Sequence, residues 1–369
     1  MKENFNINNF IQTLPKPIPS GGIDYYQNEL KQALSFCKKR SENYDLYLSS
    51  NRRSSNVNYL PIKLDIENVS RCNFACQMCA VADWEKGKRA PDMSLADFKN
   101  LIDDQYGLVE IKLNGLGEAL MQGNDYFEMI KYARSKKIWV RMTTNASLLH
   151  VKENYKKLVD TDVNEIDISV DGVTKDVFEK IRKQSKFEMV VNNCKLINGY
   201  LKSINKVRTK MWVLLQKDNF HQLNDFLPLA DDMGFKHLIF SLNLHGWGDK
   251  KLELVNHDRI IDFQLSEKEL NRIVEDGNSR GIRVSFWDVN SKFDISSPEK
   301  LCPWPFERAV VTSDLRTVPC CMIGNPDQYE IGKETKKTFT QLWKSDEYVK
   351  FRKDHIEGKI PIPCKGCYK

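Results

Sequence analysis

Short runs of β-branched and aromatic residues alternate along most of the chain with longer segments in which apolar residues recur at helical spacing. Such runs predict strands, and the helical spacing predicts amphipathic helices. The predicted strands are residues 62–67, 109–114, 138–143, 165–170, 210–215 and 237–242. Repeated strand–helix units are typical of a parallel sheet in the α/β class. Six units predict an open, partial (β/α)6 barrel rather than a closed barrel of eight.

Three of the predicted helices lie between these strands. The helix over 94–105 begins at Ser94, because serine accepts a backbone hydrogen bond at the amino end of a helix. The helix over 219–234 ends at Gly234, a residue type that is common just past a helix. A third helix is predicted over 178–193.

The pattern also divides the chain into three parts. Residues 1–60 are polar and contain one predicted helix, about residues 24–40, so we expect an N-terminal extension. Residues 61–290 contain the strand–helix units and form the predicted barrel. Residues 291–369 have a different character and form a predicted second, small domain.

The C-terminal part begins with a predicted hairpin over 308–321, which turns near Asp314 and Leu315. A helix is predicted over 338–358, and the chain then becomes rich in cysteine. Neither feature continues the strand–helix pattern, which is why the boundary is placed at residue 291.

Composition limits the class of protein. The 369 residues are 41% hydrophobic and 29% charged, which is ordinary for a globular protein with a sizeable core. The net charge of +6 is spread along the chain and has no recognition-helix signature beside it, so no nucleic-acid partner is expected. A secretory signal and a membrane-spanning apolar run are both missing from the sequence, so we expect a cytoplasmic protein with no membrane partner.

The ten cysteines are distributed unevenly. Three lie at 72–79 and five between 302 and 367, while Cys37 and Cys194 stand alone among apolar residues and are expected to be core thiols. In a reducing compartment, clustered thiols are more often metal ligands than disulfides. The distribution therefore predicts two metal sites.

The first cluster has three cysteines, Cys72, Cys76 and Cys79, in a loop directly after the first strand. Thiolates bind zinc or iron–sulfur clusters. A structural zinc site requires four ligands, whereas three thiolates would hold three irons of a [4Fe–4S] cluster and leave the fourth iron open. In parallel barrels, chemistry takes place at the carboxyl ends of the strands, where this loop lies.

This Cys-x3-Cys-x2-Cys motif after the first strand resembles the radical S-adenosylmethionine (SAM) superfamily. Further segments resemble the family in the right order: "NGLGEAL" at 114–120, "TTNAS" at 143–147 and "ISVDG" at 168–172. The resemblance covers residues 62–245. It implies that the methionine part of SAM chelates the open iron, and that reductive cleavage gives a 5′-deoxyadenosyl radical that abstracts hydrogen from a substrate. It also implies an electron donor such as flavodoxin or ferredoxin.

The resemblance also implies which residues contact SAM. The glycines would let the backbone approach the ligand, Glu118 would accept a hydrogen bond from the SAM ammonium, and the segment after the fourth strand would face the ribose. Arg182 would be a structural or carboxylate-pairing cation. The expected SAM-binding residues are Gly115, Gly117, Glu118, Asn145, Ser169, Asp171 and Gln216.

The second cluster can supply four thiolates, from Cys302, from Cys320 or Cys321, and from Cys364 and Cys367. Taken alone, these could form a structural zinc site. Beside a radical SAM barrel they resemble the auxiliary-cluster domain called SPASM, or its shortened form, twitch. No cysteine lies between Cys321 and Cys364, so one auxiliary [4Fe–4S] cluster is expected and twitch is favoured. The spacing from Leu315, which replaces a family glycine, favours Cys320 as the ligand.

Four thiolates would close the auxiliary cluster, which favours electron transfer. The leading prediction is therefore oxidation of a small-molecule substrate such as a sugar, aminocyclitol or nucleotide-linked sugar, as in aminocyclitol dehydrogenases. A catalytic Cys321 that returns hydrogen would instead give an epimerase. A third alternative is a maturase of ribosomal peptides, although residues 1–60 are short for a leader-binding module. The non-enzyme alternative is a zinc-binding interaction protein.

Overall fold

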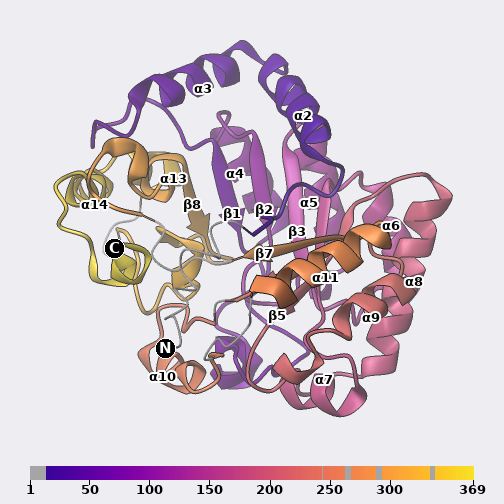
Figure 1. Ribbon diagram of the computed structural model, residues 1–369. Coiled ribbons are helices and arrows are strands. Elements are labelled where there is room, and N and C mark those ends of the chain that lie inside the picture. The colour runs from indigo at the N-terminus through magenta and orange to yellow at the C-terminus, as the bar shows by residue number, and fades with distance from the viewer. Residues whose placement is uncertain (1–13, 243, 262–266, 288–292, 333–336) are drawn as a thin grey trace.

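A curved sheet of nine strands forms the centre of the molecule in the computed structural model (Figure 1). The description covers residues 14–242, 244–261, 267–287, 293–332 and 337–369. The strand order is β7-β6-β5-β4-β3-β2-β1-β8-β9. The strands are β1 Lys63–Ile66, β2 Glu110–Leu113, β3 Trp139–Thr144, β4 Glu165–Ser169, β5 Thr209–Leu214, β6 His237–Ser241, β7 Arg283–Trp287, β8 Arg308–Val311 and β9 Thr317–Val318.

Helices connect the strands and surround the sheet (Figure 1). The α-helices are α2 Ile23–Ser35, α3 Lys38–Ser50, α4 Leu95–Asp104, α5 Asn124–Ser135, α6 Asn154–Asp160, α7 Lys175–Ile181, α8 Phe187–Ser203, α9 Phe226–Asp232, α10 Lys250–His257, α11 Glu267–Ser279, α12 Trp304–Glu307, α13 Phe339–Trp343 and α14 Asp346–Ile356. Short 3₁₀ helices cover Ala80–Asp83, Glu85–Gly87, Ala119–Gln122, Val151–Glu153, Phe220–Gln222, Pro298–Lys300, Cys321–Ile323 and Ile362–Cys367. Among the described residues, no helix is both long and apolar enough to cross a membrane.

The six predicted strands are confirmed as β1 to β6, and all of them pair in parallel. Ser94 caps α4 as expected, with its hydroxyl accepting from the backbone N–H of Asp97 at 3.0 Å. The helices predicted over 178–193, 219–234 and 338–358 are each interrupted, so these segments hold shorter helices than the pattern indicates.

Two further strands extend this parallel array. Strand β7 pairs with β6, and β8 pairs in parallel with β1, with Lys63 opposite Arg308. The predicted hairpin is confirmed, because β8 and β9 are antiparallel and Leu315 has a φ of 63° at the turn. Residues 308–311 therefore continue the barrel sheet, although the sequence pattern assigned them to the small domain.

The prediction of a single helix over 24–40 is wrong, because the structure has two helices, α2 and α3. Cys37 is extended (φ −154°, ψ 147°) and separates them. This break brings the buried guanidinium of Arg40 to three backbone carbonyls that it donates to. They belong to Ala33 at 3.0 Å, Tyr106 at 3.1 Å and Lys136 at 2.7 Å.

Replacing Arg40 with methionine is expected to lower the free energy of unfolding by about 2–3 kcal/mol, because buried carbonyls lose their donor. Urea unfolding followed by circular dichroism measures the change. Lys38→Met is the matched control, because Lys38 is 89% exposed and its loss is expected to cost less than about 0.5 kcal/mol. Equal unfolding midpoints for the two variants would contradict this role of Arg40.

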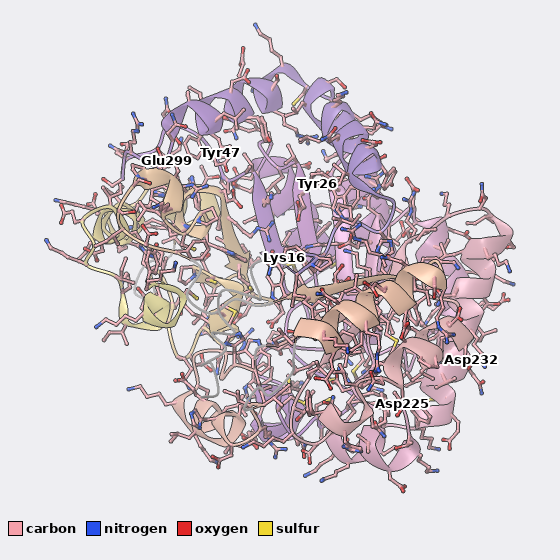
Figure 2. The ribbon with its side chains drawn as sticks, in the orientation of Figure 1. Lys16, Tyr26, Tyr47, Asp225, Asp232 and Glu299 are labelled. Carbon is pink, nitrogen blue, oxygen red and sulfur yellow. The ribbon has the colours of Figure 1, made fainter. Side chains whose placement is uncertain are left out.

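Buried ion pairs close the amino end of the barrel. Glu110 accepts a hydrogen bond from the hydroxyl of Tyr26 at 3.0 Å, a residue of α2 that Figure 2 labels. Its carboxylate oxygens lie 3.2 Å from Nη2 of Arg308, 3.5 Å from Nε of Arg141 and 3.6 Å from Nζ of Lys63. Burial alone would raise the pKa of Glu110, but these three cations lower it. The charged groups at this end of the barrel are therefore already paired with one another.

Candidate active site

A cavity of about 410 Å³ occupies the interior and the carboxyl end of the barrel. Each of the strands β1 to β8 contributes at least one residue to its wall. The volume is within the range of small-molecule binding sites. The cavity also contacts the loop that carries the three clustered cysteines, and it reaches the segment around Cys321.

The cysteine loop is fixed by backbone contacts to the end of α7. The N–H groups of Ala75 and Gln77 donate to the carbonyls of Lys183 at 2.9 Å and Ile181 at 3.0 Å. Cys72, Cys76 and Cys79 all line the cavity. One loop therefore presents three thiols to the same space, as the motif predicts.

The surroundings of these thiols fit an iron–sulfur cluster. The N–H of Phe74 donates to Sγ of Cys72 at 3.4 Å, and Nη1 of Arg182 lies 4.0 Å from Sγ of Cys76. Burial raises the pKa of Cys72 and of Cys79 to about 12, so binding to iron would have to displace the thiol protons. Among the described residues, no three potential ligands converge closely enough for a single metal ion. Three thiols at one cavity wall can hold three irons of a cluster, as the motif predicts.

The two glycines of the 114–120 segment are required by the cysteine loop and its neighbours. A Cβ atom on Gly117 would lie 2.5 Å from the carbonyl oxygens of Val69 and Arg71, and one on Gly115 would lie 2.4 Å from the side chain of Glu67. Both glycines also line the cavity. The backbone at both glycines therefore lies close to other parts of the chain, and not only to a bound ligand.

Glu118 is buried at the cavity wall and is positioned by three donors. It accepts from Oγ1 of Thr144 at 2.7 Å, the N–H of Asn145 at 2.8 Å and the N–H of Leu120 at 3.3 Å. Burial raises the pKa of its carboxyl, although these hydrogen bonds lower it. Such a fixed carboxylate can accept a further hydrogen bond from an ammonium group.

If Glu118 binds the SAM ammonium, Glu118→Gln will raise the Kd for SAM about 10- to 100-fold, the cost of a hydrogen bond to a charged group. Calorimetry on the cluster-loaded protein measures this change. Because only the ionised carboxylate binds an ammonium, wild-type affinity will fall as the pH drops through the raised pKa of Glu118. Glu128→Gln, on the exposed face of α5, is the control. An unchanged Kd in Glu118→Gln would contradict the assignment.

The other expected SAM-binding residues differ in what they contact. Asn145 lines the cavity, and its Nδ2 lies 3.8 Å from Sγ of Cys72. Ser169 also lines the cavity. The carboxylate of Asp171 pairs with Nη2 of Arg182 at 2.7 Å, in agreement with the carboxylate-pairing role of that arginine. Its other oxygen, Oδ1, accepts a hydrogen bond from the N–H of Leu214 at 2.7 Å, so both oxygens of Asp171 are already engaged.

Gln216 does not belong to the residues that line the cavity. Its side chain is fully buried, and neither its amide oxygen nor its amide nitrogen has a hydrogen-bond partner among the described residues. Buried amides are normally paired. The free amide would suit the predicted contact with the nucleoside of SAM. Against this prediction, Gln216 is not among the residues that line the cavity.

The sequence predictions missed a layer of charged side chains inside the barrel. Asp65, Lys112 and Asp167 line the cavity from β1, β2 and β4. Oδ1 of each aspartate accepts no hydrogen bond from a described residue, and both residues are buried. Trp212 and Trp287 also line the wall, from β5 and β7. The signal was present in the sequence as charged residues at every second position of apolar strands, which point to one side of the sheet.

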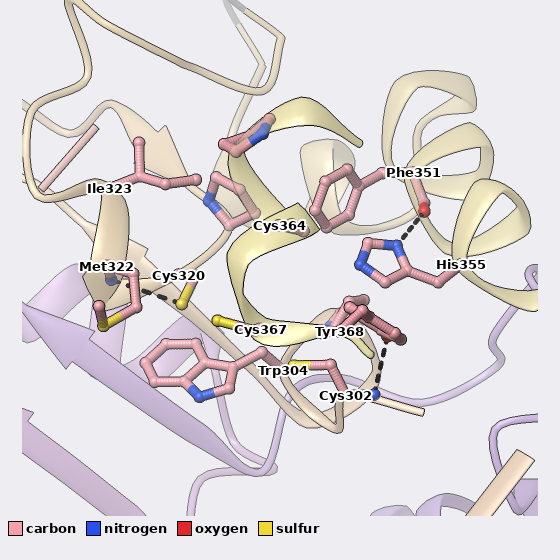
Figure 3. Close-up of a pocket in the computed structure, with 13 residues that line it drawn as sticks. Cys302, Trp304, Cys320, Met322, Ile323, Phe351, His355, Cys364, Cys367 and Tyr368 are labelled. Atoms are coloured by element: carbon pink, nitrogen blue, oxygen red, sulfur yellow. Dashed lines mark hydrogen bonds between the residues drawn. The ribbon is translucent and has the colours of Figure 1, made fainter. Parts of the chain in front are cut away.

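A second group of cysteines surrounds a separate, small cavity in the C-terminal part (Figure 3). Cys302, Cys320, Cys364 and Cys367 line it, together with Tyr368 and other aromatic residues. The N–H of Met322 donates to Sγ of Cys320 at 3.4 Å, and burial raises the pKa of Cys364 to about 12. Four thiols around one buried space fit a fully ligated iron–sulfur cluster.

Cys321 lines the barrel cavity instead, and it is not among the residues around the second cysteine group. The two adjacent cysteines therefore belong to different cavities. This placement agrees with the spacing argument for Cys320 as the ligand. The two stray cysteines lie elsewhere: Cys194 is buried in α8, and Cys37 is half-buried between α2 and α3.

A partial parallel barrel with three cysteines at its carboxyl end, beside a second set of four, defines a class of enzymes that cleave SAM at an iron–sulfur cluster. The profile of the Radical SAM superfamily matches residues 68–230, and that of an iron–sulfur cluster-binding domain, SPASM, matches residues 302–368. The chain belongs to the radical SAM superfamily and carries a C-terminal SPASM domain. Its cofactors are SAM, the radical SAM [4Fe–4S] cluster and an auxiliary iron–sulfur cluster.

Several curated proteins are similar in sequence. The tungsten-containing aldehyde ferredoxin oxidoreductase cofactor-modifying protein of Pyrococcus furiosus is 24% identical over 78% of this chain and 82% of that protein. The cysteine-type anaerobic sulfatase-maturating enzyme of Clostridium novyi is 23% identical over 81% of this chain and 82% of that enzyme. Mycofactocin maturase MftC of Mycobacterium tuberculosis is 30% identical over 57% of this chain, which spans only 53% of that maturase.

Solved structures confirm the fold. Streptococcus suis SuiB bound to S-adenosylmethionine has a TM-score of 0.62 at 15% identity, with 84% of this chain and 72% of SuiB covered. The structure named anSMEcpe with bound AdoMet has a TM-score of 0.56 at 18% identity, with 83% and 88% covered. At these identities the likeness establishes the architecture alone.

Proposed function

We propose that this radical SAM enzyme is a maturase that modifies a residue of a peptide or of a peptide-derived cofactor precursor. The observation that carries the proposal is the sequence likeness, over most of both chains, to a cofactor-modifying protein and a sulfatase-maturating enzyme. MftC, a mycofactocin maturase, supports it over a shorter region.

The chain's own residues would hold the reactants in order. Cys72, Cys76 and Cys79 would bind a cluster with one open iron, and Glu118 would orient SAM through its ammonium group. When bound there, SAM supplies a 5′-deoxyadenosyl radical upon one-electron reduction. The charged side chains and the tryptophans of the barrel wall would position the substrate unit and limit the access of water to it.

The second candidate is oxidation of a small polar metabolite, which was the leading prediction from the sequence. One carboxylate oxygen each of Asp65 and Asp167 accepts no hydrogen bond from a described residue. Together with Lys112 they favour a substrate rich in hydroxyl or amino groups, because buried polar atoms are normally hydrogen-bonded. The tryptophan side of the wall suits the apolar face of a ring. This candidate stands second because the relatives aligned over most of the chain are named as maturation or cofactor-modifying proteins.

One experiment separates the two candidates. Cluster-loaded protein, SAM and reduced flavodoxin are incubated with size-fractionated extract of the organism that encodes the chain, and 5′-deoxyadenosine formation is followed. The proposal predicts that stimulation elutes with peptides and is destroyed when the fraction is digested with protease beforehand. Stimulation that survives protease and elutes with metabolites would support the second candidate instead. Cys72→Ala protein is the control for formation that does not depend on the cluster.

A further inference from the structure

Cys320 and Cys321 are consecutive in sequence, yet their side chains belong to different cavities. Cys320 faces the C-terminal group of four cysteines, and Cys321 faces the barrel cavity that also contains Cys72, Cys76 and Cys79. With four other cysteines available around the C-terminal cavity, Cys321 is left as a thiol in the space where a substrate would lie.

The surroundings of Cys321 show that this part of the cavity is prepared for a polar ligand. Asp65 and Lys112 line the barrel cavity together with Cys321 and interact with it electrostatically, as does Arg308 of β8. Asp65 is only 3% exposed, lines the same cavity, and has an oxygen, Oδ1, that accepts no hydrogen bond from a described residue. Arg308 approaches that oxygen no closer than 3.5 Å. Oδ1 of Asp65 thus has an ion-pair partner but no hydrogen-bond donor among the described residues, so it can accept a hydrogen bond from a ligand in the cavity.

We propose that Cys321 is a hydrogen-atom donor to carbon radicals formed in the barrel cavity. The inference rests on the proposed function, since it needs a radical SAM reaction to generate the carbon radical. In the step, the S–H bond of Cys321 breaks and a C–H bond forms on the substrate carbon, which leaves a thiyl radical on Cys321. One electron from a ferredoxin- or flavodoxin-type donor and one proton restore the thiol.

This step determines the class of reaction. A substrate carbon that loses a hydrogen atom on one side and receives one from Cys321 has undergone no net oxidation, so the product can differ from the substrate in configuration alone. Each turnover then consumes two electrons and one SAM. If the substrate radical instead loses an electron and a proton, the product is oxidised. Cys321 therefore favours inversion of a stereocentre within the maturation reaction.

Hydrogen isotope transfer tests the proposal without the natural substrate. Thiol hydrogens exchange with solvent whereas carbon-bound hydrogens do not. The reaction is run in D2O with SAM and reduced flavodoxin but without substrate. Under these conditions the 5′-deoxyadenosyl radical itself takes the place of the substrate radical and accepts the hydrogen atom. We expect the 5′-deoxyadenosine formed by the wild-type protein to carry one deuterium from Cys321, as measured by mass spectrometry. The label per molecule is expected to fall to background in Cys321→Ala and in Cys321→Ser. Cys37→Ala, which changes a thiol outside the cavity, is expected to keep it.

Two readouts that do not depend on activity accompany this test. Mass spectrometry after iodoacetamide treatment of cluster-loaded protein is expected to find Cys321 alkylated and Cys320 protected. Iron per chain is expected to be retained in Cys321→Ala and reduced in Cys320→Ala. Protection of Cys321 together with iron loss in Cys321→Ala would make it the cluster ligand and overturn the inference.

The possible failures are distinguishable. If no 5′-deoxyadenosine forms in the wild-type protein, the proposed function fails. If 5′-deoxyadenosine forms but its deuterium content does not depend on Cys321, the proposed role of Cys321 as a hydrogen donor is wrong. The assignment of the protein as a radical SAM enzyme is not affected by that result.

Discussion

Alanine in place of Cys72, Cys76 or Cys79 is expected to abolish 5′-deoxyadenosine formation. The three thiols act as a unit, and removal of one member of such a unit typically costs at least about 10³-fold in rate. The structure places all three on one loop, at the wall of one cavity. The loop carries no fourth cysteine, and Cys321, which lines the same cavity, belongs to the C-terminal segment. A substituted loop would therefore have no spare thiol of its own to complete the cluster.

The measurement is 5′-deoxyadenosine by liquid chromatography, with anaerobically loaded protein, SAM and reduced flavodoxin. Cys37→Ala is the matched control, because Cys37 is a half-buried cysteine far from this loop in sequence and outside the cavity wall. The three variants should also lose the absorbance of one cluster while the control keeps it. SAM cleavage at the wild-type rate in any of the three would contradict their assignment as ligands.

The second large effect is expected from Cys364→Ala. Cys364 lines the C-terminal cavity with Cys302, Cys320 and Cys367, so its loss opens a site that four thiols would otherwise close. Because a [4Fe–4S] cluster holds four irons, iron per chain is expected to fall from about eight to about four. Some 5′-deoxyadenosine should still form, because the Cys72 loop is separate.

Iron analysis with parallel zinc analysis checks this prediction. Cys321→Ala is the control, since Cys321 faces the barrel cavity and is expected to leave the iron content unchanged. A Cys364→Ala protein that loses one zinc and no iron would show that the C-terminal site is structural. In that case a redox role for the site would have to be abandoned.

The barrel could be predicted from sequence where local signals were strong. Strands β1 to β6 are short apolar runs between helical segments, and their parallel pairing follows from that alternation. Strand β8 was missed as a barrel strand because its pairing with β1 joins residues far apart in sequence, such as Lys63 and Arg308. No local pattern carries that information.

The break between α2 and α3 illustrates the same limit at shorter range. Residues 24–40 have a continuous helical pattern, but the buried contacts of Arg40 to Tyr106 and Lys136 require a change of direction at Cys37. Tertiary hydrogen bonds outweigh local propensity here. The pattern alone cannot show a partner that lies on other elements.

Some parts of the active site could be predicted from the sequence, whereas others depend on the folded structure. The three cysteines share one loop, and Glu118 and Asn145 follow neighbouring parallel strands, whose carboxyl ends meet at one edge of the sheet. Cys321 was named as a candidate, but the opposite orientations of Cys320 and Cys321 depend on the fold of the C-terminal segment. That one oxygen each of Asp65 and Asp167 accepts no hydrogen bond from a described residue depends on what every neighbouring strand presents to them.

The most direct test of the account is the iron, sulfide and zinc content per chain of wild-type protein purified without oxygen. We predict about eight irons with matching sulfide and no stoichiometric zinc, which corresponds to two [4Fe–4S] clusters. About four irons with one zinc would contradict the auxiliary cluster, and zinc without iron would contradict radical SAM chemistry in this protein altogether.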